Sequence, residues 1–287
     1  MSGRVCILTP DPGSEGYLTR WRDVLRTNAA PLEAAGLEVE HRSWAGAEDL
    51  TGFDLVLPLL VWGYPFAPEQ WAAAVERWET EGVRLHNPAS VLRWNADKHY
   101  LSTLESRGAP IVPTIYADRL DERAMREAAE RLGSGRLVAK PRISSTAWRT
   151  IRWSPGEPLE GGPEGEAMIQ PYLPEIERTG EVSMIFFGGA FSHAIAKRPQ
   201  PGDFRVQPEF DGIIRAHLPA EEEHDAAARI LAAVEEDLLY ARVDLVRGMY
   251  GSPLLIELEL IEPDLYLGYH AEAPQRFAAA AKELIAH

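Results

Sequence analysis

The sequence contains one cysteine, Cys6, and no apolar run that approaches the length of a membrane span. A lone cysteine cannot form an internal disulfide, and its place in the strand-like run Val5–Leu8 predicts a small buried side chain rather than a nucleophile. The chain moves directly into this run, without the apolar segment and small-residue cleavage site of a secretory signal. We therefore expect no thiol chemistry, no membrane span and a cytoplasmic location.

Basic residues are also scarce: 29 Lys and Arg stand against 44 Asp and Glu, which gives a formal charge of -15. Binding to nucleic acid requires Lys and Arg clustered on one face, so we do not expect it. Two common phosphate-binding signatures, G-x-x-x-x-G-K-[ST] and G-x-G-x-x-G, do not occur. The residues after Leu8 fit a dinucleotide-binding turn poorly, which argues against a dehydrogenase. Any nucleotide must be held in another way.

Alternating strand-like and helical patterns predict an α/β domain at residues 1–95. Apolar runs at 4–9 and 54–61 are typical of parallel strands, and a helix is expected from about Tyr17 to Ala35. Pro68-Glu69 marks the first turn of another helix.

Residues 96–173 predict a small α+β lobe. Strands at 113–116 and 137–140 flank a helix at 121–132, and the Gly- and Pro-rich stretch 155–165 indicates a hairpin or a loop.

Residues 174–287 predict a third unit with one helix between Ala220 and Leu238. Its strands are expected at 181–187, 190–197, 242–247 and 253–261.

Three carboxylates near the C-terminus give the clearest chemical signal. Glu257 and Glu259 alternate with aliphatic residues, so in a strand both side chains point to one face. Asp244 lies in a second strand-like run upstream. If the two strands are neighbours, the three carboxylates converge, and a hard cation such as Mg²⁺ is needed to balance them. A solvent-facing edge strand is the alternative for each strand alone.

Two lysines and one proline-flanked segment complete the pattern. Lys98 follows Asn95-Ala96-Asp97, and Lys140 closes an apolar run before Pro141, where ligands often bind in α/β proteins. The segment Met168–Pro174 predicts a stiff extended connection whose free backbone groups can contact an adenine edge, with an ordinary linker as the alternative.

From about Asn87 to Pro263, these pieces in their order resemble the ATP-grasp ligases, and within them the glutathione synthetase branch. The resemblance implies fold class α/β and α+β, namely an ATP-grasp fold preceded by an N-terminal Rossmann-like pre-ATP-grasp domain. It also implies ATP and Mg²⁺ as cofactors. The matching segments are Asn87-Pro88 with Asp97-Lys98, Ala139-Lys140-Pro141, Gln170-Pro171-Tyr172-Leu173, Lys197 through Gln207, Arg242-Val243-Asp244 and Glu257-Leu258-Glu259.

The same resemblance implies a role for each site residue. For Mg²⁺ it implies Asp244, Glu257 and Glu259, where the third family position is often Asn. Arg242, Arg205 and Lys197 would balance charge on the transferred phosphoryl group, and the segment from Lys197 to Gln207 would close over ATP and substrate. The implied ATP contacts are Lys98, Lys140, Gln170, Tyr172 and Leu173, with Glu181 at the ribose and Glu177 as its runner-up.

The implied reaction phosphorylates a carboxylate and lets a nitrogen displace phosphate from the acylphosphate. Further runs, among them Trp94–Lys98 and Phe191–Ala194, resemble the O-ureido-D-serine cyclo-ligase group, which closes an amino acid derivative into the D-cycloserine ring in antibiotic biosynthesis. A peptide-forming ligase of the glutathione synthetase type and a non-catalytic nucleotide-binding module stay open as alternatives. The expected partner is a small amino-acid-like molecule, and a homodimer is an open option.

Four further side chains have alternative interpretations. Trp62 and Tyr64 follow the second predicted strand and are candidate substrate contacts. His270 is expected to be structural, whereas His193 is equally compatible with a structural role and with a substrate or phosphate contact.

Overall fold

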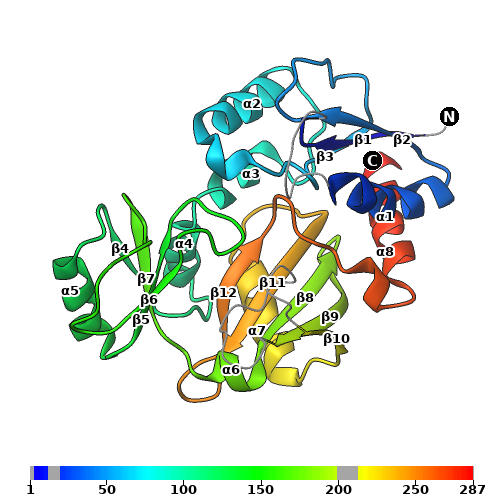
Figure 1. The fold of residues 1–287 in the computed structure, drawn as a ribbon. Coiled ribbons are helices and arrows are strands. Elements are labelled where there is room, and N and C mark those ends of the chain that lie inside the picture. The colour runs from blue at the N-terminus through cyan, green and yellow to red at the C-terminus, as the bar shows by residue number, and fades with distance from the viewer. Residues whose placement is uncertain (1–2, 12–19, 199–212, 287) are drawn as a thin grey trace.

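The computed structural model describes residues 3–11, 20–198 and 213–286, whose strands form three sheets (Figure 1). The N-terminal sheet has the order β2-β1-β3 and is parallel throughout, as the alternation of strand and helix patterns predicts. The elements of this part are β1 (Arg4–Thr9), α1 (Trp21–Ala34), β2 (Glu38–Ser43), β3 (Leu55–Leu57), η2 (Tyr64–Phe66), α2 (Pro68–Thr80) and α3 (Ala89–Asn95).

Two differences from the expected elements have local causes. The run 54–61 forms a strand only from Leu55 to Leu57, because Pro58 has no backbone N–H with which to continue the ladder. Strand β2 was not predicted, since its polar sequence Glu-Val-Glu-His-Arg-Ser lacks an apolar face and it lies at the sheet edge.

The second sheet has the order β4-β7-β5-β6, and its pairings are antiparallel. Helix α5 begins after Asp121, whose carboxylate accepts from the Ala124 N–H at 2.8 Å, and it ends at Gly133 with φ of 60°. The stretch 155–165 forms turns between β6 and β7 rather than a hairpin of its own. The elements here are α4 (Tyr100–Ser106), β4 (Ile115–Ala117), α5 (Glu122–Leu132), β5 (Leu137–Pro141), β6 (Ile151–Trp153) and β7 (Ala167–Pro171).

The third sheet has the order β10-β9-β8-β11-β12 with antiparallel neighbours. The four predicted strands are confirmed with shifts of up to two residues at their ends, while β10 was not predicted. The elements are α6 (Glu175–Thr179), β8 (Glu181–Phe187), β9 (Ala190–Arg198), β10 (Ile213–His217), α7 (Glu221–Ala232), β11 (Tyr240–Arg247), β12 (Pro253–Glu259), η4 (Leu267–Tyr269) and α8 (Ala273–Ala286).

Buried side chains join these parts through the third sheet. One face of that sheet packs against α7 and α4, with Val243 and Leu258 beside Ile230 and Leu101. The other face shares its core with the N-terminal sheet and α8, which lies next to α1 (Figure 1). No helix within the described residues is long and apolar enough to cross a bilayer. We propose domain ranges of 1–95, 96–173 and 174–287, and each of the three sheets lies within one range.

Candidate active site

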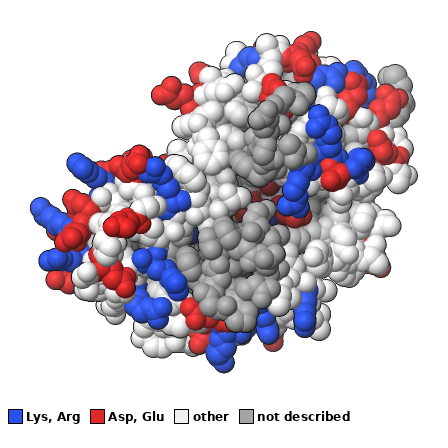
Figure 2. All heavy atoms as spheres, viewed as in Figure 1, with Lys and Arg blue, Asp and Glu red and all other residues white. Residues whose placement is uncertain are grey.

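A cavity of about 400 Å³ lies where the three parts meet. Figure 2 shows acidic atoms at the bottom of a hollow between the N-terminal part and the rest, while basic and acidic side chains are interspersed elsewhere on this face. The cavity takes wall residues from each part: Trp62 and Tyr64 from the first, Lys140 and Gln170 from the second, and Asp244 from the third.

The three predicted carboxylates converge on one wall of this cavity. Strands β11 and β12 are antiparallel neighbours, with Asp244 directly opposite Glu257. One oxygen from each of Asp244, Glu257 and Glu259 lies within 4.8 Å of the other two. The expectation of two neighbouring strands with carboxylates on one face is therefore confirmed, and the donor set of carboxylate oxygens suits a hard divalent cation.

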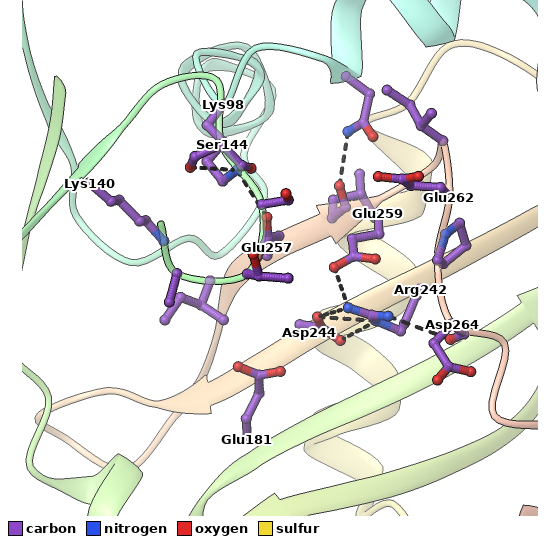
Figure 3. A pocket seen from close by; sticks show the side chains of 18 of the residues that line it. Lys98, Lys140, Ser144, Glu181, Arg242, Asp244, Glu257, Glu259, Glu262 and Asp264 are labelled. Atoms are coloured by element: carbon purple, nitrogen blue, oxygen red, sulfur yellow. Dashed lines mark hydrogen bonds and ion pairs between the residues drawn. The ribbon is translucent and has the colours of Figure 1, made fainter. Parts of the chain in front are cut away.

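Cationic side chains surround the cluster. The Arg242 guanidinium donates to Asp244 at 2.9 Å and also to Glu259. Lys197 Nζ lies 3.6 Å from an Asp244 oxygen and 2.7 Å from a Glu181 oxygen. Figure 3 shows Arg242 between Asp244 and Glu259.

The lysines predicted from sequence lie beside Glu257 of this cluster. Lys98 Nζ lies 3.3 Å from a Glu257 oxygen and donates to the Ser144 carbonyl at 2.6 Å. Lys140 projects from β5 toward Glu257 (Figure 3). Two ammonium groups therefore line the cavity next to Glu257, where they can contact an anionic ligand.

Burial and charge pull the pKa values of these groups apart. Burial raises the pKa of Glu259 to about 8, because the opposing effect of Arg242 is smaller and Glu257 and Asp244 add to the rise. Burial also favours a higher pKa for Glu257, but Lys98 and Lys140 outweigh it and lower the value. Burial lowers the pKa of Lys140. A site with such unequal carboxylates is typical of a functional centre.

The end of the cavity near β7 has an apolar lining. Gln170 is buried and donates to the Thr114 hydroxyl at 2.9 Å, and Leu173 follows at the turn into α6. The expectation of an extended connection with free backbone groups is wrong for most of the segment. Residues 168–171 belong to β7, an inner strand paired with β5 and β4, and the Tyr172 N–H donates to the Arg136 carbonyl at 2.8 Å. Glu177 pairs with the Tyr172 hydroxyl and is not part of the cavity wall, whereas Glu181 is.

Comparison with known proteins identifies the family. Residues 5–87 match the model for the N-terminal domain of D-cycloserine synthetase DcsG. The cycloserine biosynthesis protein DcsG of Streptomyces lavendulae is 32% identical over 270 residues, covering 86% of this chain and 89% of the relative. The chain belongs to the DcsG family of ATP-grasp ligases.

Further likenesses agree with this DcsG-family assignment. The crystal structure of D-cycloserine synthetase DcsG superposes with a TM-score of 0.83 at 27% identity, covering 99% of this chain and 100% of that one. The glutathione synthetase of Ralstonia nicotianae is 27% identical over 270 residues, covering 88% of this chain and 78% of the relative. The ATP-grasp ligase PsnB, solved with Mg and ADP, shares the fold with a TM-score of 0.69 at 16% identity, covering 99% of each chain.

The resemblance inferred from sequence is thus confirmed, and the chain is an ATP-dependent carboxylate–amine ligase. The alternative of a non-catalytic nucleotide-binding module is set aside. Arg205 and the segment 199–207 lie outside the described residues, so only Lys197 and Arg198 of the predicted basic loop are placed, at the end of β9.

His193 and His270 of this DcsG-family ligase, the two histidines singled out from the sequence, have structural partners. His193 is buried, and its Nε2 is within 3.1 Å of the Leu265 and Tyr266 carbonyls while its Nδ1 lies 2.9 Å from the Ser192 hydroxyl. It stacks on His270 with ring centroids 6.2 Å apart. Neither histidine contributes to the cavity wall, which favours the structural interpretation of both.

Sequence reasoning missed several wall residues. Val138 could have been found, because it precedes Lys140 by two positions on the same face of β5. Ser144 follows β5 in a segment with no regular pattern, and Glu262 follows β12 beyond the alternating run. Nothing local in the sequence marks either of these two.

Proposed function

We propose that this ligase closes the ring of a small amino acid derivative of the O-ureido-D-serine type, which gives D-cycloserine or a close analogue. Two similarities support the proposal: the 32% identity with the Streptomyces lavendulae protein named for cycloserine biosynthesis, and the match of residues 5–87 to the N-terminal domain of D-cycloserine synthetase. The nitrogen nucleophile then belongs to the same molecule as the activated carboxylate.

The cavity supports assignments for ATP. Lys98 and Lys140 hold the phosphates, since their ammonium groups face the cavity beside Glu257. Glu181 receives the ribose hydroxyls. The adenine lies against Gln170, Leu173 and the carbonyl side of Tyr172, next to the apolar side chains of Val138 and Ile256.

Asp244, Glu257 and Glu259 are the proposed ligands for Mg²⁺, and three carboxylate oxygens within 4.8 Å of one another fit that ion. When bound, Mg²⁺ neutralises phosphate charge and polarises the transferred phosphoryl group. Arg242 and Lys197 add positive charge to the same wall. Arg205 is the third proposed cation.

The residues act by position and charge. A substrate carboxylate oxygen attacks the γ-phosphate and ADP leaves. The oxygen-bonded ureido nitrogen then attacks the acyl carbon, phosphate departs, and that nitrogen gives up its proton to solvent. Water removes the carbamoyl group from the ring nitrogen as carbamate, which breaks down to carbon dioxide and ammonia. The described residues at the cavity include no Ser-His-Asp or Cys-His set, and the proposed steps need no covalent intermediate on the protein. We also propose that the reaction takes place in the cytoplasm, where ATP is available.

The observation that carries the ATP-dependent chemistry is the one cavity in which the Asp244, Glu257 and Glu259 cluster lies beside Lys98 and Lys140. The test is ATP-dependent phosphate release with O-ureido-D-serine, with mass spectrometry of the organic product. A cyclised product formed only with ATP and Mg²⁺ is expected.

A peptide-forming ligase is the second candidate, favoured by the 27% identity with glutathione synthetase. Incubation with γ-glutamylcysteine and glycine separates the two. Glutathione formation without cyclisation of O-ureido-D-serine would reject the ring-closing proposal and leave the ligase chemistry in place.

A further inference from the structure

Glu262 is a partly buried acid that none of the roles above uses. It follows β12 by three residues and forms part of the cavity wall beside Glu259 (Figure 3). Its Oε2 atom is buried and accepts no hydrogen bond from the described residues. A buried carboxyl oxygen in this situation loses its contacts with water and gains nothing in return.

The other acids of the cavity wall differ in this respect. Glu257 pairs with Lys98, Asp244 and Glu259 pair with Arg242, and Glu181 pairs with Lys197. Among ion pairs between described residues, none includes Glu262. The sixth acid of the wall, Asp264, is exposed and accepts from the Tyr266 N–H at 2.9 Å. Glu262 is thus the wall acid with a buried oxygen that has no partner among the described residues.

The surroundings of Glu262 suit a positively charged ligand group. Burial raises the pKa of Glu262 well above its ordinary range, and the charge of Glu259 adds to the rise. Burial, with the charge of Glu262 as the next cause, likewise raises the pKa of Tyr64. Trp62 and Tyr64 supply aromatic rings at the same wall, and such rings attract ammonium groups. A cation bound here would relieve the repulsion between Glu262 and Glu259.

The magnesium role does not extend to Glu262. The group of three carboxylates whose oxygens lie within 4.8 Å of one another consists of Asp244, Glu257 and Glu259. The α-ammonium nitrogen of an amino acid, however, lies only about 2.5 Å from its carboxyl carbon. A residue that binds this ammonium must therefore stand next to the phosphoryl-transfer centre, and Glu262 lies beside Glu259 in the cavity wall (Figure 3).

We propose that Glu262 binds the α-ammonium group of the amino acid substrate and selects substrates that carry one. This assignment rests on the proposed function and adds a specificity residue to it. The ammonium gains a charge-assisted hydrogen bond to a carboxylate shielded from water, and Glu262 gains the donor it lacks. Substrates without the amino group leave Glu262 unpartnered and bind less well.

The test compares O-ureido-D-serine with 3-(ureidooxy)propanoate, the same molecule without its amino group. Steady-state phosphate release is measured for the wild-type protein, for Glu262→Gln and for Glu283→Gln, an exposed acid on α8 away from the cavity. Calorimetry with a non-hydrolysable ATP analogue reports folding and nucleotide binding independently of the substrate.

For Glu262→Gln, kcat/KM for O-ureido-D-serine is expected to fall on the order of 10- to 100-fold, mostly through KM. The value for 3-(ureidooxy)propanoate should change by less than about twofold, and affinity for the ATP analogue should stay the same. Equal losses on both molecules would overturn the assignment and indicate a role in metal binding or folding. Unchanged kinetics would overturn it as well, since Gln preserves hydrogen bonding but removes the charge.

The proposed function has a separate outcome. If the wild-type protein released no phosphate with O-ureido-D-serine, the ring-closing function would be rejected together with this assignment. If the wild-type protein turned over O-ureido-D-serine but Glu262→Gln lowered kcat/KM equally for the two molecules, only the assignment of Glu262 to the ammonium group would be rejected.

Discussion

Each carboxylate of the active site is distinguished by its neighbours rather than by its own chemistry. Asp244 is fully buried and held by Arg242 and Ser183, so that it also supports the sheet. Glu257 has about a third of its side chain exposed (34%) and faces the two lysines. Glu257 is therefore the position at which ligand chemistry can be changed with the least effect on the fold.

Replacement of Glu257 by Gln should strongly reduce ATP turnover while the protein stays folded. Gln keeps the shape but removes the charge that Lys98 and the proposed Mg²⁺ share, and a loss on the order of 100-fold in kcat is expected. ADP formation at saturating Mg²⁺ is the measurement, with the exposed Asp237→Asn as control. Wild-type-like ADP formation by Glu257→Gln would remove the metal assignment.

Replacement of Lys140 by Ala should weaken nucleotide binding. The lysine is a cation inside an acidic cavity, and the loss of one charge-assisted contact predicts an affinity on the order of 10-fold lower for a non-hydrolysable ATP analogue. Lys282→Ala serves as control, because Lys282 lies on α8 and donates to the Ala35 carbonyl on the surface. Equal affinities of the two variants by calorimetry would make Lys140 a structural residue.

At this scale the sequence predicts residues whose role follows from strand periodicity. Glu257 and Glu259 share a face by alternation alone. To place Asp244 beside them, only the pairing of β11 with β12 had to be predicted. Asn87 belongs to a segment that resembles the ATP-grasp ligases, but the contacts of its side chain could not be predicted. Its side chain donates to the carbonyls of Tyr240 and Leu260, more than 150 positions away, at 2.9 and 2.7 Å.

Among the secondary-structure elements, prediction succeeded where a local signal exists. Pro68 at the first position of α2 and Asp121 before α5 are such signals, and both helices begin where expected. Strands β2 and β10 carry no clear alternation and owe their conformation to pairing with β1 and β9. Their formation depends on a neighbouring strand, which a single segment of sequence does not reveal.

The junction between α6 and β8 provides a test of this dependence on neighbours. Gly180 has φ of 80°, and a Cβ atom there would lie 2.1 Å from the Lys197 carbonyl oxygen of β9. Gly180→Ala should therefore separate the start of β8 from the end of β9 and displace both Glu181 and Lys197. A loss of on the order of 3 kcal/mol in the free energy of unfolding is expected.

Gly251→Ala is the matched control for Gly180→Ala. Gly251 has a similar φ of 83°, but an added Cβ would meet nothing within 4 Å. Only the backbone conformation is then unfavourable, at a cost of about 1–2 kcal/mol. Denaturant unfolding of the two variants gives the comparison. If the two variants lost the same free energy of unfolding, the backbone at Gly180 would have moved to accommodate the Cβ atom, and the close approach to Lys197 would cost nothing.

In the whole molecule, the active site exists only where three parts meet, and this could not be predicted from separate motifs. The segment between β5 and β6 illustrates the point. Its residues 144–147 and Thr150 form part of the cavity wall. Trp148 in the same segment contacts Phe66 of the N-terminal part, with ring centroids 5.5 Å apart at an angle of 88°. The contact joins the second part to the first across the cavity.

Loss of this contact should uncouple ATP consumption from product formation. Both rings are substantially exposed, at 43% for Trp148 and 49% for Phe66, so Trp148→Ala removes about 1 kcal/mol of edge-to-face contact without opening a core. The segment that carries Trp148 is then held less firmly over the site, and water reaches the acylphosphate more often. The measured ratio of ADP to ligated product is expected to rise above one, with nucleotide affinity nearly unchanged.

Phe66→Ala should give the same ratio as Trp148→Ala, and the double variant should raise it little further, because the two rings form one contact. Tyr250→Ala, which removes an aromatic ring that is 95% exposed in the turn between β11 and β12, is the control and should keep the ratio at one. If Trp148→Ala also kept a ratio of one, the contact between the two parts would have no role in protecting the intermediate.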